Sequence, residues 1–95
     1  MIYSYVKEVN TMSFKKWLKQ FENVDHAIGD LAKDVAVDKA FPSKVGTMDS
    51  LTDYLYSKNA SEAAIITAKN VFIFYALDEG LAHLENGDLV WQRNN

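Results

Sequence analysis

Apolar residues recur at the spacing of one helix face along most of the chain. Ser13 can cap a first helix, whose apolar positions fall at i, i+3, i+4 and i+7: Phe14, Trp17, Leu18 and Phe21. Asp25 can cap a second helix, with the same spacing at Ile28, Leu31, Ala32 and Val35. The pattern therefore predicts two consecutive amphipathic helices, the second of which stops near Lys39.

A lone proline separates this pair from a third predicted helix. Proline has no backbone N–H and disfavours helical geometry in the residue before it, so the second helix must end before Phe41. Thr47 or Asp49 can cap the third helix, whose apolar positions are Met48, Leu51, Tyr54 and Leu55. We expect the Phe41 ring to insert between the first and third helices.

The longest predicted helix opens at residues 59–62, runs to about Asp78 and ends at Gly80, a residue suited to a left-handed C-terminal position. Its main apolar stripe, which suffices for contact with a core, contains Ile65, Ala68, Phe72, Tyr75 and Ala76. Further apolar residues on its other sides are the candidate protein-binding residues: Ile66, Ile73, Phe74 and Leu77. Two interpretations stay open. Either a partner or a second copy of the chain covers these four residues, or the chain's own tails cover them through Tyr3, Tyr5, Leu89 and Trp91.

The two ends of the chain have a different pattern. Asn86-Gly87 between apolar positions predicts a tight turn. Residues 2–6 are aromatic and β-branched enough to form a strand that pairs with residues 89–91, although the first helix could equally start early, through Val6 and Val9. The predicted fold class is all-α: a compact bundle of four to five short helices, to which a small terminal β-hairpin or strand pair can be added.

A length of 95 residues suits one domain, so residues 1–95 are predicted to form a single unit. Residues 13–79 are its helical core, and residues 1–12 and 80–95 are terminal extensions. With no cysteine, the chain has no disulfide and no thiolate zinc site. The N-terminus lacks the pattern of a signal peptide, and no apolar run is long enough to span a membrane. We therefore expect a soluble cytoplasmic protein without membrane association.

Candidate chemistry is sparse. His83 follows Asp78 and Glu79 and precedes Glu85, but we expect a solvated helix end there, and His26 falls on another element. Three carboxylates recur at i, i+4 and i+8, namely Asp30, Asp34 and Asp38, and are expected to form a solvated face. Ser13, Thr47 and Ser61 are better explained as helix caps than as nucleophiles. No catalytic residue, metal ligand or cofactor site is predicted.

The best case for nucleic-acid binding is the small basic face of Lys15, Lys16 and Lys19. Against it, the net charge is −3, and the neighbouring aromatic residues lie on the opposite, core-facing side of that helix. A phosphate-binding turn would need several glycines, whereas only Gly46 precedes the third helix. The sequence therefore argues against nucleic acid as a partner.

The middle of the chain resembles a known family. An Asp38-x-x-Phe41-Pro42 element follows the stretches 13–18 and 28–32, and a Tyr54-Leu55 pair lies in the third helix. In order and spacing these are similar to the YozE-type SAM-like domain, a small helical family of Gram-positive bacteria and their phages, over about residues 13–79. The resemblance implies a SAM-like helical bundle and no established activity or binding residues. We expect a non-enzymatic module for protein–protein interaction, with a nucleic-acid-binding accessory protein as the alternative.

Overall fold

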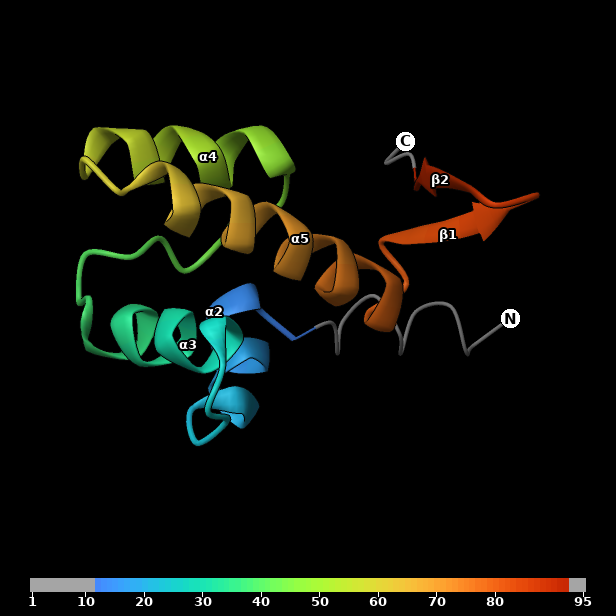
Figure 1. The fold of residues 1–95 in the computed structure, drawn as a ribbon. Helices are drawn as coiled ribbons and strands as arrows, with labels where there is room; N and C mark the ends of the chain where they lie inside the picture. The colour runs from blue at the N-terminus through green and yellow to red at the C-terminus, as the bar shows by residue number, and fades with distance from the viewer. Residues whose placement is uncertain (1–11, 93–95) are drawn as a thin grey trace.

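The computed structural model describes residues 12–92, and the labels used below are those of Figure 1. The helices are α2 (Phe14–Leu18), which continues into the 3-10 turn η1 (Lys19–Phe21), α3 (Ala27–Val37), α4 (Met48–Ser57) and α5 (Glu62–Asp78). A two-stranded antiparallel hairpin follows, with strands β1 (Ala82–Glu85) and β2 (Asp88–Trp91). The mostly helical fold with a terminal hairpin is confirmed.

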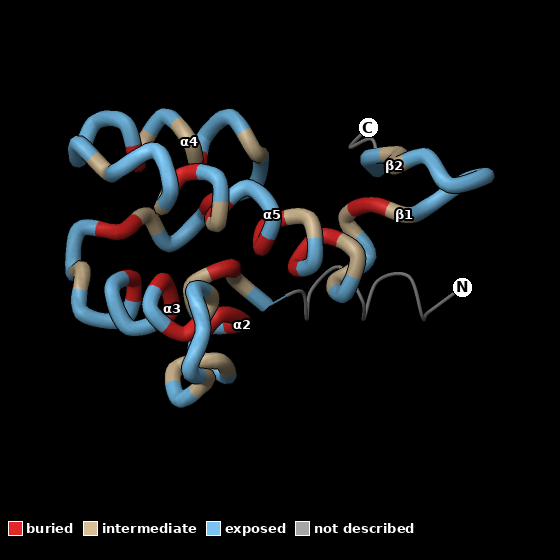
Figure 2. The backbone as a smooth tube through the Cα atoms, viewed as in Figure 1, coloured by how far each residue is buried: buried red, intermediate tan, exposed pale blue. Residues whose placement is uncertain are grey.

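Helix α5 is the centre of the fold. Helix α4 lies along one side of it, α2 and α3 lie along the other, and the hairpin extends beyond its C-terminal end (Figure 1). Residues that face this central helix are buried, whereas the outer turns are exposed (Figure 2). Helices α2, α3 and α4 and strand β1 are therefore positioned by their contacts with α5.

Local side-chain chemistry fixes three helix starts. Ser13, Thr47 and Ser61 have extended backbones, and the hydroxyl of each accepts a hydrogen bond from the N–H three residues later. At Thr47 the bond is reciprocal, because the Ser50 hydroxyl accepts from the Thr47 N–H and completes a capping box. The predicted capping roles of all three residues are confirmed.

Helix α3 differs from its prediction at both ends. The N-cap residue is His26, not Asp25, and no side-chain bond caps the helix there. At the other end the helix stops at Val37, two residues before Lys39, because Asp38 has an extended backbone. The first helix also differs, since its regular part ends at Leu18 and continues as a 3-10 turn.

A glycine explains how tightly the chain turns into α3. Gly29 is buried, and a Cβ atom built on it would lie 1.7 Å from the carbonyl oxygen of Val24. A side chain at this position would collide with backbone, which cannot move aside as a flexible side chain can. The close contact between α3 and the turn before it thus requires glycine.

The core is rich in aromatic residues. The Phe14 ring lies 5.3 Å, centroid to centroid, from both Phe72 and Tyr75 on α5, in edge-to-face geometry. Phe41 is buried, and its centroid is 6.3 Å from Phe14 and 5.2 Å from Tyr54 on α4. The expected insertion of Phe41 between the first and third helices is therefore confirmed.

The hairpin has the turn that its sequence predicts. Asn86 and Gly87 have φ values of 52° and 86°, the two left-handed residues of a type I′ turn. Gly80, with φ 77°, ends α5 in a left-handed conformation as expected, and Ala82 and Trp91 pair across the strands. The alternative strand at residues 2–6 lies outside the described residues.

Candidate protein-interaction surface

Helix α5 is apolar around most of its circumference. Its inner side contains the whole predicted stripe, and each member is buried: Ile65, Ala68, Phe72, Tyr75 and Ala76. Val71 is buried as well. This side alone provides the helix with its core contacts.

The four predicted protein-binding residues lie on the opposite side, and we call them the outer face: Ile66, Ile73, Phe74 and Leu77. At 100° per residue, Ile66, Ile73 and Leu77 point within about 40° of one another, and Phe74 lies beside them. Ile66 is 56% exposed and Phe74 is 61% exposed, whereas Ile73 and Leu77 are half-buried. Among residues 12–92, the core cluster and the side chains packed against it include none of the four. The structure therefore brings them together on one face; whether they bind a partner stays a prediction.

A shallow depression extends the outer face toward the first helix. It measures about 510 Å³ and is lined by Trp17, Gln20, Phe21, Phe74, Leu77 and Asp78. The Trp17 indole N–H donates a 2.7 Å hydrogen bond to Asp78 Oδ2, which fixes the ring against α5. Phe21, which was predicted to lie in the core, is half-buried and packs against the core cluster from its edge.

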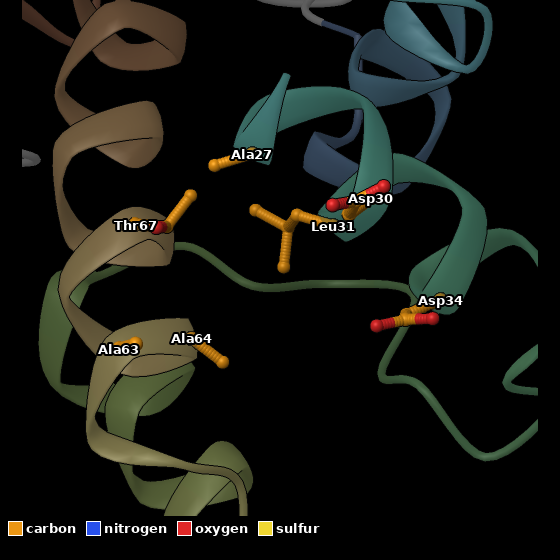
Figure 3. Close-up of a pocket in the computed structure, with 7 residues that line it drawn as sticks. All are labelled: Ala27, Asp30, Leu31, Asp34, Ala63, Ala64 and Thr67. Atoms are coloured by element: carbon orange, nitrogen blue, oxygen red, sulfur yellow. The ribbon is translucent and has the colours of Figure 1, made fainter. Parts of the chain in front are cut away.

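A second depression lies between α3 and the first turns of α5 (Figure 3). This groove of about 190 Å³ has small and apolar walls from Ala27, Leu31, Ala63, Ala64 and Thr67. The carboxylates of Asp30 and Asp34 lie at its α3 edge and are exposed. Within the described part of the chain neither carboxylate is joined by a hydrogen bond or ion pair that would form a built site.

The third member of the predicted carboxylate row has a different environment. Asp38 lies beyond the end of α3 and is half-buried, so its assignment to a solvated helix face is wrong. Its Oδ2 accepts a 2.5 Å hydrogen bond from the Tyr54 hydroxyl, and its Oδ1 accepts one from the Ala40 N–H. Asp38 thus ties the Phe41-Pro42 turn to α4, which gives the Asp-x-x-Phe-Pro element and the tyrosine a structural role.

This pair has shifted pKa values. The hydrogen bond from Tyr54 lowers the pKa of Asp38, and the N–H of Ala40 lowers it further, against the effect of burial. Burial and the hydrogen bond to Asp38 raise the pKa of Tyr54 to about 12. Both shifts therefore favour the ionised aspartate and the neutral tyrosine of this contact.

The two histidines lie apart in the described part of the chain. His26 is an exposed N-cap residue, and His83 lies in β1, not at a helix end as expected. His83 Nε2 is 2.8 Å from Glu85 Oε2, and Glu79 instead accepts a hydrogen bond from the Met12 N–H. Over residues 12–92, no three His, Cys, Asp or Glu side chains are grouped as metal ligands.

The predicted basic face is smaller than expected. Lys15 is half-buried, and its ammonium donates a 3.0 Å hydrogen bond to the carbonyl oxygen of Asp38. Lys16 and Lys19 are exposed, while Phe14 and Trp17 are buried, as predicted. Gly46 leads into the Thr47 cap, where the side chains of Ser50 and Thr47 accept from the N–H groups of Thr47 and Ser50.

The longest described helix, α5, has 17 residues. A helix that crosses a bilayer needs about 20 predominantly apolar residues. Between Met12 and Gln92, no helix is both long and apolar enough to cross a membrane.

Comparison with known proteins identifies a family and no individual relative. Neither a curated protein nor a solved structure matches the chain. The family model described as the YozE SAM-like fold matches residues 13–76, from the cap of α2 to the last turns of α5. This segment spans the helical bundle and most of the chain, so the chain belongs to the YozE SAM-like family.

Proposed function

We propose that the chain is a non-enzymatic protein-interaction module that binds its partner through the outer face of α5. The observation that carries this proposal is the exposure of Phe74 and Ile66 on the central helix of the fold. An aromatic side chain on such a patch is the kind of group that dominates binding energy at protein interfaces.

The shape beside Phe74 favours a partner that inserts apolar side chains. The open depression formed with Trp17 and Phe21 gives such a side chain three rings to contact. The Trp17 ring is already held by Asp78, so little side-chain freedom is lost when a partner binds there. Burial of apolar surface contributes roughly 25 cal/mol per Å² before these ordering costs are subtracted.

Three of the carboxylates considered as chemical candidates have structural contacts. Asp38 accepts from Tyr54, Asp78 accepts from Trp17, and Glu79 accepts from the Met12 backbone. A group committed to holding helices together is not free to exchange protons with a substrate. This use of the side chains supports the non-enzymatic part of the proposal.

The experiment is affinity capture with the immobilised full chain, from a lysate of the cells that produce it, combined with sedimentation of the purified chain. Phe74→Asp places a charge in the proposed contact and is expected to abolish capture or self-association. Tyr56→Asp is the matched control, because Tyr56 is an equally exposed aromatic residue (65%) on α4.

The two variants separate the outcomes. Loss of the partner with Phe74→Asp and its retention with Tyr56→Asp supports the outer face of α5. Equal retention by both variants moves the binding surface elsewhere, and a chain that captures nothing and stays monomeric contradicts the proposal.

A further inference from the structure

The turn of the hairpin contains the one Asn-Gly pair of the chain, because Gly87 alone among the four glycines follows an asparagine. Asn86 and Gly87 are both exposed, and a Cβ atom built on Gly87 would meet no atom within 4 Å. A hairpin of only two strands is marginally stable by itself, and glycine permits large backbone rotations. The Asn86 carboxamide and the Gly87 nitrogen therefore have the space and the freedom to approach each other.

Such an approach leads to a covalent reaction. The backbone nitrogen of the following residue bonds to Cγ of the asparagine, and the bond from Cγ to the amide nitrogen breaks. The proton of the attacking nitrogen passes through water to the departing nitrogen, which leaves as ammonia. Water then opens the cyclic imide at either carbonyl and gives aspartate or isoaspartate, whose backbone is one methylene longer. The reaction needs no reagent but water, and asparagine is accordingly one of the thermolabile residues.

Asn59 is the closest structural counterpart of Asn86. It is also exposed, and its φ of 59° is close to the 52° of Asn86. The nitrogen that follows it is engaged, however, because the Ala60 N–H donates a 3.0 Å hydrogen bond to the Leu55 carbonyl oxygen. A nitrogen held in this way is not free to attack the carboxamide beside it.

The two other asparagines of the described chain are protected as well. After Asn23, the Val24 N–H donates a 3.0 Å hydrogen bond to the Phe21 carbonyl oxygen. Asn70 lies inside α5, where the next residue is buried and its N–H belongs to the helix. Gly87 differs from all three, since the backbone hydrogen bonds of turns and loops within residues 12–92 include none from its N–H.

We propose that Asn86 is a site of spontaneous deamidation, selected by the free N–H of Gly87, and that the isoaspartate product opens the hairpin. Aspartate adopts the left-handed conformation as asparagine does, so that product keeps the turn. Isoaspartate lengthens the two-residue connection that pairs Glu85 with Asp88. The inference goes beyond the proposed function and does not depend on it, because the turn is not part of the outer face of α5.

Opening of the hairpin has a local reporter. The Trp91 ring, at the end of β2, stacks on Phe72 with 6.1 Å between centroids, and the Gln92 N–H donates a 2.8 Å hydrogen bond to the Leu81 carbonyl oxygen. Both contacts join the base of the hairpin to the rest of the fold. A change of strand register at the turn is therefore expected to move Trp91.

The test is incubation of the purified full chain at physiological temperature and pH, in water labelled with heavy oxygen, followed by peptide mass spectrometry. We expect Asn86 to be converted to aspartate and isoaspartate with uptake of one heavy oxygen atom, while Asn59 stays intact. Loss of Asn86 no faster than that of Asn59 would overturn the proposal.

Two variants test the selection and its consequence. Ala60→Gly creates a second Asn-Gly pair, whose N–H still bonds to Leu55, so Asn59 should stay intact; its loss as fast as that of Asn86 would show that the free N–H does not select the site. Asn86→Asp should leave the Trp91 indole resonance unchanged, whereas the isoaspartate form, separated by ion exchange, should shift it. An unshifted Trp91 resonance in the isoaspartate form would contradict opening of the hairpin.

Discussion

The two sides of α5 have similar compositions and different environments. The inner side places Phe72 at 0% exposure within a cluster of aromatic rings, and two residues later the outer side leaves Phe74 at 61%. A helix that only completes a core would be polar on its outer side. Apolar residues that the core does not use are therefore the best guide to a binding surface of this chain.

The largest expected effect separates these two phenylalanines directly. Phe72→Ala should lower the free energy of unfolding by about 3–5 kcal/mol, because it empties a large site in a packed core. Phe74→Ala should change it by no more than about 0.5 kcal/mol, as expected of an exposed position. Urea unfolding of both variants measures the difference, and similar costs would remove the distinction between the two sides.

Replacement of Phe41 tests whether the core on the inner side of α5 also needs a side chain from the turn after α3. Its ring packs between Phe14 and Tyr54, so Phe41→Ala should also cost about 3–5 kcal/mol. Thermal unfolding followed by circular dichroism is the measurement. An unchanged midpoint would mean that the Phe41-Pro42 turn does not contribute to the core.

Tyr75 belongs to the inner side through its ring and contacts the N-terminal segment through its hydroxyl. Tyr75→Phe keeps the ring and removes the hydrogen bond to the Met12 carbonyl, so it should cost about 0.5–1.5 kcal/mol. The amide resonance of Met12 should shift more than those of α4. A shift centred on α4 would contradict the tether between Met12 and α5.

The smallest expected effects concern the Asp38–Tyr54 contact, which joins the turn after α3 to α4. The pKa of Asp38 is lowered from 3.8, so its contribution to stability is present above that pH and is lost as the pH falls through the lower, folded value. The pKa of Tyr54 is raised from 10.0 to about 12, so its contribution is complete below pH 10.0 and is lost as the pH rises through about 12.

In a plot of unfolding free energy against pH, Tyr54→Phe should reduce both the loss at acidic pH that comes from Asp38 and the loss at alkaline pH that comes from Tyr54. Spectrophotometric titration of the folded chain should also lose a tyrosine that ionises late. If the variant and the unmodified chain lose stability equally at both ends of the pH range, the Asp38–Tyr54 contact has no energetic role.

Features set by local chemistry could be predicted from the sequence. The caps at Ser13, Thr47 and Ser61 and the turn at Asn86-Gly87 depend on residues at most three positions apart. The same is true of the inner stripe of α5, because helical periodicity alone assigns it to one side. The family resemblance added the expected bundle, and the family match confirms it.

Features set by contacts between distant residues could not be predicted. Asp38 continues the spacing of Asp30 and Asp34, but its bond to Tyr54, 16 residues away, places it outside the helix face. The start of α3 depends on the approach of Val24 to Gly29, and the depression beside Phe74 is formed by residues of α2, η1 and α5 together. Periodicity within one segment does not contain this information.

The central claim is that the outer face of α5 is dispensable for folding and required for binding, and one variant tests both halves. For Phe74→Asp we predict a thermal midpoint close to that of the unmodified chain and complete loss of partner capture or self-association. The midpoint is a sensitive readout, because a loss of 1 kcal/mol in stability would shift it by about 4–8 °C. A midpoint lowered by that much would place Phe74 in the core. Undiminished capture at an unchanged midpoint would show that the chain binds through another surface.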